Sequence, residues 1–190
     1  EDSYASILDR LSKKAVRAQI PMGAEGDFEG VVDLLSMKAY TFSGKMGEEV
    51  IEGEIPAQYL DDAKMYRAEL VERIVENDEA QMNAFLEGNE PSLEELKTTL
   101  RKAVINNEIF PVYTGSALKN KGVQLVLDAV VDYLPSPLDL AAVKGTNPKT
   151  GEEVTRSASD SEPFTALAFK LQTDPFVGAL TFFRVYAGTV

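Results

Sequence analysis

Apolar side chains recur along the chain with two different spacings, and these spacings predict an alternation of strands and helices. Residues 108–113 are rich in β-branched and aromatic side chains, which is typical of a buried strand. Residues 123–134 show the helical spacing, with apolar side chains at Val123, Val126, Leu127, Val130 and Val131. We expect this helix to end at Pro135, because proline cannot continue a helix. The two segments predict a strand and a helix joined by a short polar loop.

The N-terminal part of the chain combines one helix with several strands. Residues 1–14 predict a short amphipathic helix, with apolar side chains at Tyr4, Ile7, Leu8 and Leu11. Residues 16–20 alternate between apolar and polar side chains, which predicts a strand that ends at Pro21. An antiparallel meander of short strands is expected at residues 27–35, 37–42 and 49–52.

Helical periodicity dominates the next part of the chain. Residues 57–76 predict a long helix after Pro56, with one apolar arc formed by Tyr59, Leu60, Ala63, Leu70, Val71 and Ile74. Arg67 lies among these apolar positions. A shorter helix is expected at residues 78–86. Ser92 and Glu95 have the spacing of a capping box, which predicts that a further helix begins there and runs to about residue 104.

The opposite arc of the long helix is acidic, and we call it the acidic face; it comprises Asp61, Asp62, Met65, Glu69, Glu72 and Glu76. A merely solvated surface is the simpler interpretation of such an arc. The charge distribution favours a partner, because residues 48–95 carry 15 acidic and 3 basic side chains, whereas the remainder carries 16 of each. We expect this segment to bind a basic protein and not nucleic acid, because phosphate backbones are held by Lys and Arg.

Composition excludes several classes of site. The 190 residues include neither cysteine nor histidine, which excludes a disulfide framework, a thiolate metal site and the commonest general base. We expect no catalytic residue and no metal ligand in this chain. No apolar run approaches the roughly 20 residues of a membrane span, so a cytoplasmic location is expected.

The C-terminal part predicts a linker followed by two strands. Residues 138–162 are rich in turn-forming and small polar side chains, which indicates a linker with one hairpin. Residues 164–171 and 180–186 are predicted strands. Two strands do not make an independently stable sheet, and the chain does not begin with Met, so we expect it to be a piece of a longer protein.

The loop between residues 113 and 123 carries the sequence Gly115-Ser-Ala-Leu-Lys-Asn-Lys-Gly122 at the carboxyl end of a predicted strand. In open α/β sheets this is where ligands bind. Ser-Ala-Leu-Lys alone is also compatible with an ordinary connection in which Ser116 or Asn120 caps the following helix. The longer string, which continues through Leu127-Asp-Ala-Val-Val-Asp-Tyr-Leu-Pro-Ser-Pro137, resembles the last guanine-recognition loop of bacterial elongation factor G.

That resemblance implies roles for four residues of the loop. The backbone N–H of Ala117 faces the guanine O6, Ser116 steadies the loop, and Leu118 and Lys119 border the base. A fixed donor suits a keto oxygen and rejects adenine, which presents an amino group at the same place.

Two further segments are similar to the same family. Pro21-Met-Gly23, with residues 28–34 and 37–39, resembles the insertion within its GTPase domain. Residues 167–170, 173–178 and 180–188 look like the first strands of its second domain. The implied fold class is α/β, with an α+β insertion on the end of a P-loop GTPase fold, followed by the first strands of a β-barrel domain. The implied division is a GTPase-domain helix (1–14), the inserted subdomain (15–107), the last strand and helix of the GTPase domain (108–137), a linker (138–162) and the start of the barrel (163–190).

The resemblance implies a translational GTPase that moves transfer and messenger RNA through the ribosome during protein synthesis. Its cofactors would be GTP or GDP and Mg²⁺, and the acidic face would meet the C-terminal domain of the ribosomal stalk protein. The phosphate loop and the switch regions are not among these residues, so we expect this chain alone to be inactive and to bind nucleotide only weakly. The alternatives are a stand-alone acidic interaction module, a binding domain for an unrelated ligand at Thr114, and a related ribosome-protection or release GTPase.

Overall fold

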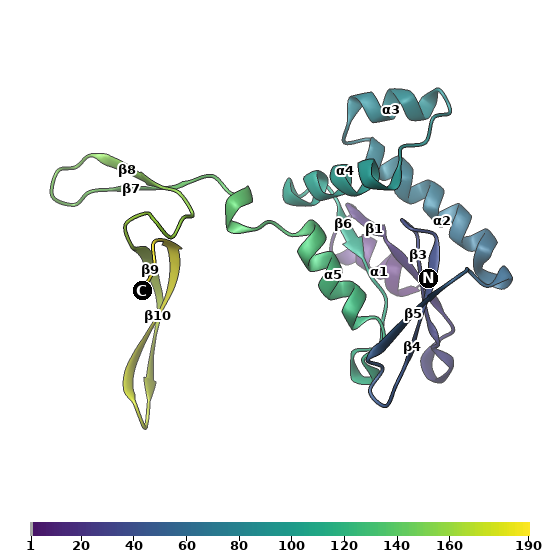
Figure 1. Ribbon diagram of the computed structural model, residues 1–190, viewed down its shortest axis with the longest axis horizontal. Helices are drawn as coiled ribbons and strands as arrows, with labels where there is room; N and C mark the ends of the chain where they lie inside the picture. Colours follow the sequence, from purple (N-terminus) through teal and green to yellow (C-terminus); the bar gives the residue numbers. More distant parts are fainter. Residues whose placement is uncertain (1) are drawn as a thin grey trace. The chain divides into compact units, whose positions relative to one another are not determined.

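The computed structural model describes residues 2–190 as two compact units, of which the first ends at Leu134 and the second comprises Pro135–Val190 (Figure 1). Glu1, the first residue of the helix expected at 1–14, lies outside the described residues. The chain combines helices with several small sheets, which confirms the predicted mixed α/β class. The functional division of the chain into domains stays a prediction.

The strands of the first unit form two sheets. Strand β1 (Ala15–Arg17) pairs in parallel with β6 (Phe110–Val112). Helix α1 (Asp2–Arg10) precedes β1 and ends four residues before the expected end at 14, because Leu11 is 80% exposed and does not extend the partly buried apolar stripe. The second sheet is an antiparallel meander in the order β2-β3-β4-β5, formed by β2 (Gln19–Met22), β3 (Gly30–Asp33), β4 (Lys38–Ser43) and β5 (Glu49–Gly53). This meander confirms the strands expected from the alternating pattern. A short 3-10 turn (η1, Glu25–Asp27) connects β2 to β3.

Four helices complete the first unit: α2 (Ala57–Val75), α3 (Glu79–Leu86), α4 (Leu93–Ile105) and α5 (Val123–Tyr133). Their first residues follow the expected signals. The Asp78 side chain accepts hydrogen bonds from the first turn of α3, and Ser92 and Glu95 form the predicted capping box of α4. The helical periodicity therefore located α2 and α4 to within one or two residues at each end.

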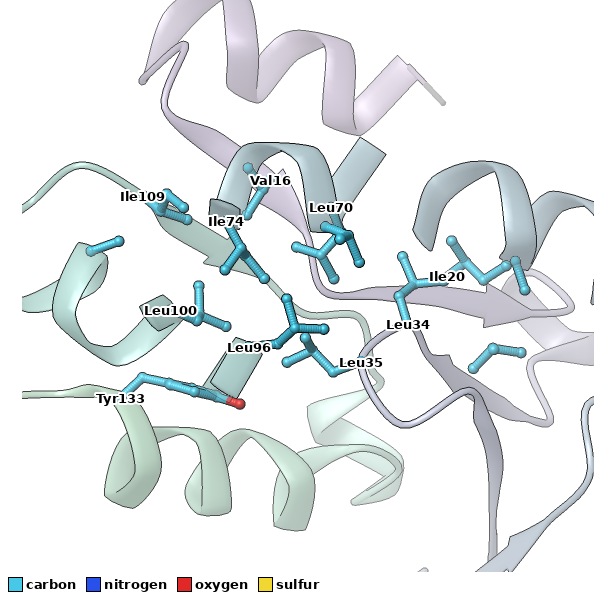
Figure 2. Packing of buried hydrophobic residues seen from close by; sticks show 14 of the residues in the cluster. Val16, Ile20, Leu34, Leu35, Leu70, Ile74, Leu96, Leu100, Ile109 and Tyr133 are labelled. Carbon is cyan, nitrogen blue, oxygen red and sulfur yellow. The ribbon is translucent and has the colours of Figure 1, made fainter. Parts of the chain in front are cut away.

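One large hydrophobic cluster holds α2, α4 and the strands together. Its innermost side chains come from both helices and from β3 and the turn after it, and Ile74, Leu96, Leu100 and Leu34 are each fully buried. Figure 2 shows these side chains converging between the helices and the strands, with Tyr133 of α5 closing one side. The apolar arc of α2 faces this core, which leaves its acidic face toward solvent.

Three local expectations are wrong, each for a physical reason. Residues 16–20 are not one strand, because the chain passes from β1 to β2 at Ala18 and the two strands belong to different sheets. Pro21 does not end β2, since β2 is an edge strand and an exposed proline is tolerated there. The strand at 108–113 is buried only at Ile109; the side chain of Phe110 is 39% exposed, because β6 pairs only with β1 within residues 2–190.

The second unit contains two hairpins after a short 3-10 turn (η3, Pro137–Asp139). Strands β7 (Val143–Thr146) and β8 (Glu153–Arg156) form the hairpin expected within the linker. Strands β9 (Thr165–Asp174) and β10 (Gly178–Ala187), predicted as strands at 164–171 and 180–186, pair antiparallel with two irregularities in their register. Their turn is fixed by Asp174, whose side chain accepts hydrogen bonds from the amides of Phe176 and Val177. Within residues 2–190 the strands do not close into a barrel.

Candidate functional site

The 115–122 loop follows β6 and forms one 3-10 turn, η2 (Ala117–Lys119). Its two ends are joined by backbone hydrogen bonds, from the Ser116 N–H to the Lys121 oxygen (2.8 Å) and from the Lys121 N–H to the Ser116 oxygen (3.0 Å). Helix α5 begins after Gly122, and neither Ser116 nor Asn120 caps it with a side chain. The loop is therefore a closed structure of its own and not a capping connection.

Two glycines allow the ends of this loop to approach each other. A Cβ atom on Gly115 would lie 2.7 Å from the Lys121 oxygen, and one on Gly122 would lie 2.8 Å from the Thr114 oxygen. Gly122 also has a left-handed backbone (φ +86°), which side chains other than glycine rarely adopt. Both positions require glycine for the loop to close as it does.

The outer side of the loop presents free backbone donors. Among the hydrogen bonds of residues 2–190, none is donated by the backbone N–H of Ala117 or of Leu118, which are the first residues of a helical turn. Ala117 is exposed, and Leu118 is 98% exposed. Two adjacent amide donors on a closed loop can bind a carbonyl oxygen of a ligand. Ser116 precedes the turn and Lys119 is its last residue. The roles that the resemblance implies for Ser116, Leu118 and Lys119 stay predictions.

The acidic face lies along one side of α2, and all six of its residues are exposed. Two of them are paired within the protein. Glu69 Oε2 lies 3.2 Å from Arg17 Nη1, and Glu76 Oε2 lies 2.7 Å from Arg73 Nη1. No ion pair within the described residues involves Asp61, Asp62 or Glu72, so these three carboxylates are available to a partner. The side chain of Met65 is 49% exposed between them.

The sequence did not indicate the hollow that adjoins the acidic face. It measures about 470 Å³ and is bordered by α1, β1 and α2. The Arg17 guanidinium lies between two aromatic rings in this hollow, 3.9 Å from the ring centre of Tyr4 and 4.3 Å from that of Tyr66. Burial raises the pKa of the Tyr4 hydroxyl, which donates a hydrogen bond to the Ala15 oxygen. An arginine between the apolar residues Val16 and Ala18 is the one sequence signal that could have pointed to this arrangement.

A smaller hollow of about 190 Å³ lies where α5 meets the turn after β3, and three tyrosines line it: Tyr40, Tyr113 and Tyr133. Burial raises the pKa of both Tyr113 and Tyr133 well above the ordinary tyrosine value, and the nearby carboxylates of Asp33 and Asp132 act in the same direction. Both hydroxyls therefore stay protonated throughout the neutral range.

Two kinds of feature are absent from the part of the chain that the structure describes. Residues 2–190 contain no group of three or more carboxylate, histidine or cysteine side chains placed to hold a metal ion. No helix in the same part of the chain has the length and apolar character needed to cross a membrane.

Comparison with known proteins places the fold. No family model matches the chain. A crystal structure of a Thermus thermophilus protein matches with a TM-score of 0.73 and 28% sequence identity, over 97% of this chain. The chain spans 25% of the length of that protein. This likeness supports the translational-GTPase-like fold that the sequence motifs predict, without distinguishing one factor from another.

Proposed function

We propose that this chain is a segment of a translational GTPase of the elongation factor G type, which promotes translocation of transfer and messenger RNA on the ribosome. The segment supplies the loop that recognises guanine and an inserted subdomain that docks on the ribosomal stalk. GTP hydrolysis, Mg²⁺ binding and the hold on the phosphates belong to other parts of the complete protein. A cytoplasmic location follows from this role.

The observation that carries the proposal is the pair of free amides on the closed 115–122 loop. Ala117 and Leu118 are exposed residues at the carboxyl end of β6, and their N–H groups are unpaired within the described chain. A rigid amide donor satisfies the O6 oxygen of guanine and meets a donor group on adenine, so it selects between the two bases. The residues present therefore fit the base of GTP, and nothing in this chain is assigned to its phosphates.

Replacing Ala117 by proline tests this role directly, because proline removes the one N–H in question. The site tolerates proline, since Ser116 has an extended backbone (φ −124°, ψ 94°) and the first position of a helical turn suits proline. In the natural protein that contains these residues, Ala117→Pro should weaken GDP binding by about tenfold or more, the worth of one hydrogen bond at 1.4 kcal/mol per decade. Ala117→Ser keeps the donor and should bind GDP like the wild type. Equal GDP affinity in both variants would refute base recognition by Ala117.

The acidic face is the part that we propose to meet the basic C-terminal domain of the stalk protein. Asp61, Asp62 and Glu72 are unpaired within the described chain, and Met65 gives an adaptable apolar contact at the centre of the face. Opposite charges on two partners accelerate their encounter more than they tighten the final complex. The proposed contact is therefore a fast and salt-sensitive one.

A matched pair of double variants tests the face. Asp62→Lys with Glu72→Lys reverses two unpaired carboxylates on α2, and Glu79→Lys with Glu87→Lys makes the same change of net charge at α3. Only the first pair should slow association with the stalk domain, by roughly three- to tenfold at low salt, and the difference should vanish as the Debye length shortens from about 10 Å at 0.1 M to about 3 Å at 1 M. Equal slowing by both pairs would mean that net charge alone matters and that the face is only solvated.

The two tests also separate the remaining interpretations. A stand-alone acidic interaction module would respond at the acidic face and show no nucleotide binding. A binding domain for an unrelated ligand would respond at the loop without any preference for guanine.

A further inference from the structure

The turn between β4 and β5 touches the 115–122 loop backbone to backbone. We call residues 44–48 the β4–β5 turn. Gly47 in this turn is buried and has a left-handed backbone (φ +65°). A Cβ atom at Gly47 would lie 2.7 Å from the Lys119 oxygen and 3.0 Å from the Asn120 oxygen. Both oxygens belong to the main chain of the loop, so a side chain at position 47 would have to displace the loop itself.

Two side-chain hydrogen bonds connect the loop and the helix that follows it to distant segments of the chain. Gln124, in the first turn of α5, donates a hydrogen bond from Nε2 to the Gly47 oxygen (2.9 Å). Lys121 donates from Nζ to the Phe28 oxygen (2.8 Å), which ties the loop to the segment that precedes β3. The first of these bonds starts in the helix that follows the loop and the second starts in the loop itself, and their acceptors lie 77 and 93 positions away in the sequence.

A small hydrophobic cluster lies behind these contacts. Phe28, Val31 and Phe42 are buried together, and Leu125 of α5 packs against them. This cluster is separate from the main core of the unit. It joins the sheet that carries the β4–β5 turn to the helix that follows the loop, so the turn and the loop share one support.

We propose that the β4–β5 turn is a positioning element for the 115–122 loop, with Gly47, Gln124 and Lys121 as the positioning residues. The hydrogen bonds within the loop fix its shape, and a recognition group must in addition be held to within about 0.5 Å of its working place relative to the rest of the site. The contact with the turn supplies this restraint for the Ala117 and Leu118 amides. The identity of the ligand that the loop binds rests on the function proposed above. The contact between the turn and the loop does not depend on that function.

Two glycine substitutions form a matched test. Gly47 and Gly88 both have left-handed backbones (φ +65° and +90°), so alanine costs a similar backbone strain at each. A Cβ atom at Gly88 meets nothing within 4 Å, whereas one at Gly47 meets the loop. The measurement is hydrogen exchange, read by NMR in the 190-residue chain, at the bonded loop amides of Ser116, Lys119, Asn120 and Lys121.

Gly47→Ala should raise exchange at these four amides by about tenfold or more relative to the amides of α4, because a local opening leaves the rest of the unit protected. Gly88→Ala should leave the loop unchanged. Gln124→Met, which removes the donor and keeps the side-chain length, should raise exchange at the same amides and decides the question if Gly47→Ala does not fold. Unchanged loop exchange in the variants that fold, or an equal increase throughout α4, would overturn the positioning role.

Nucleotide binding separates this inference from the function on which its ligand rests. In the natural protein, Gly47→Ala should weaken GDP binding by about tenfold relative to Gly88→Ala, as a displaced amide loses its hydrogen bond. A wild-type protein that does not prefer guanine would refute the proposed function, while the exchange result would still decide whether the turn holds the loop.

Discussion

We expect the replacement of Arg67 to destabilise the first unit more than the replacement of any other side chain that reaches the surface. It lies on α2, and its guanidinium donates hydrogen bonds from Nη1 to the main-chain oxygens of Leu34 (2.8 Å) and Leu35 (2.5 Å). Its Nη2 also donates to Glu90 Oε1 at 2.6 Å. Leu34 and Leu35 are buried in the core. Replacing Arg67 therefore leaves two buried main-chain oxygens without their donor.

The magnitude follows from the separate contacts. A buried carbonyl left without a donor costs about 1–3 kcal/mol, and two are affected here. The ion pair with Glu90 adds about 0–1 kcal/mol, since the Glu90 side chain is 51% exposed. We expect Arg67→Met to lower the free energy of unfolding by at least about 2 kcal/mol, the sum of the lower limits for the two carbonyls; methionine is chosen because it covers the apolar surface that the arginine stem covers.

Arg73→Met on the same helix is the matched control. Among the ion pairs of residues 2–190, Arg73 takes part only in the one with Glu76, three residues along α2, and both side chains are more than 40% exposed. Its loss should cost about 0.5 kcal/mol or less. Urea unfolding followed by the helical circular dichroism signal gives both values from the midpoint at a common slope. If Arg67→Met shifts the midpoint no further than Arg73→Met does, the interpretation of Arg67 as a donor to buried carbonyls is wrong.

Two other predictions concern pH and local stability. Burial raises the pKa of Tyr113 and of Tyr133, so as the pH rises the unfolded chain releases these protons before the folded chain does. The free energy of unfolding should therefore fall as the pH rises above about 10. In urea titrations at alkaline pH, the double variant Tyr113→Phe, Tyr133→Phe should show a smaller fall. An equal fall in the variant would contradict it. The β9–β10 hairpin exposes Leu167, Phe169 and Leu171, so its amides should exchange before those of α2 and α4 in dilute protein; equal or slower exchange there would count against it.

Periodicity and capping signals were enough for the helices because these signals are local. The apolar arc of α2, the capping box at Ser92 and the stop at Pro135 each depend on residues within one or two turns. The sequence could not indicate what Arg67 does, because its carbonyl partners lie 32 and 33 residues away and backbone oxygens leave no trace in a sequence. For the same reason, the sequence could not indicate the contact between Gly47 and the 115–122 loop.

In the candidate site, too, the sequence indicated the local features and not the contacts that depend on the fold. The glycines at positions 115 and 122 and the polar run between them indicated a tight loop after a strand. Whether its amides are free depends on how the loop closes, which the bonds between Ser116 and Lys121 determine. On the acidic face, the sequence identified the charges, and the structure divides them into paired carboxylates, such as Glu69 with Arg17, and free ones, such as Asp62.

Nucleotide titration tests the central claim, that this segment carries a guanine-recognition loop whose phosphate-binding counterpart lies elsewhere in the natural protein. By calorimetry the natural protein should bind GDP with a micromolar or lower dissociation constant and ADP at least about 100-fold more weakly, a difference of about 2.7 kcal/mol. The 190-residue chain alone should bind GDP with a dissociation constant no lower than about 1 mM, which corresponds to a binding free energy of about −4 kcal/mol. Equal affinity of the natural protein for GDP and ADP, or micromolar binding of GDP by the 190-residue chain, would contradict the account.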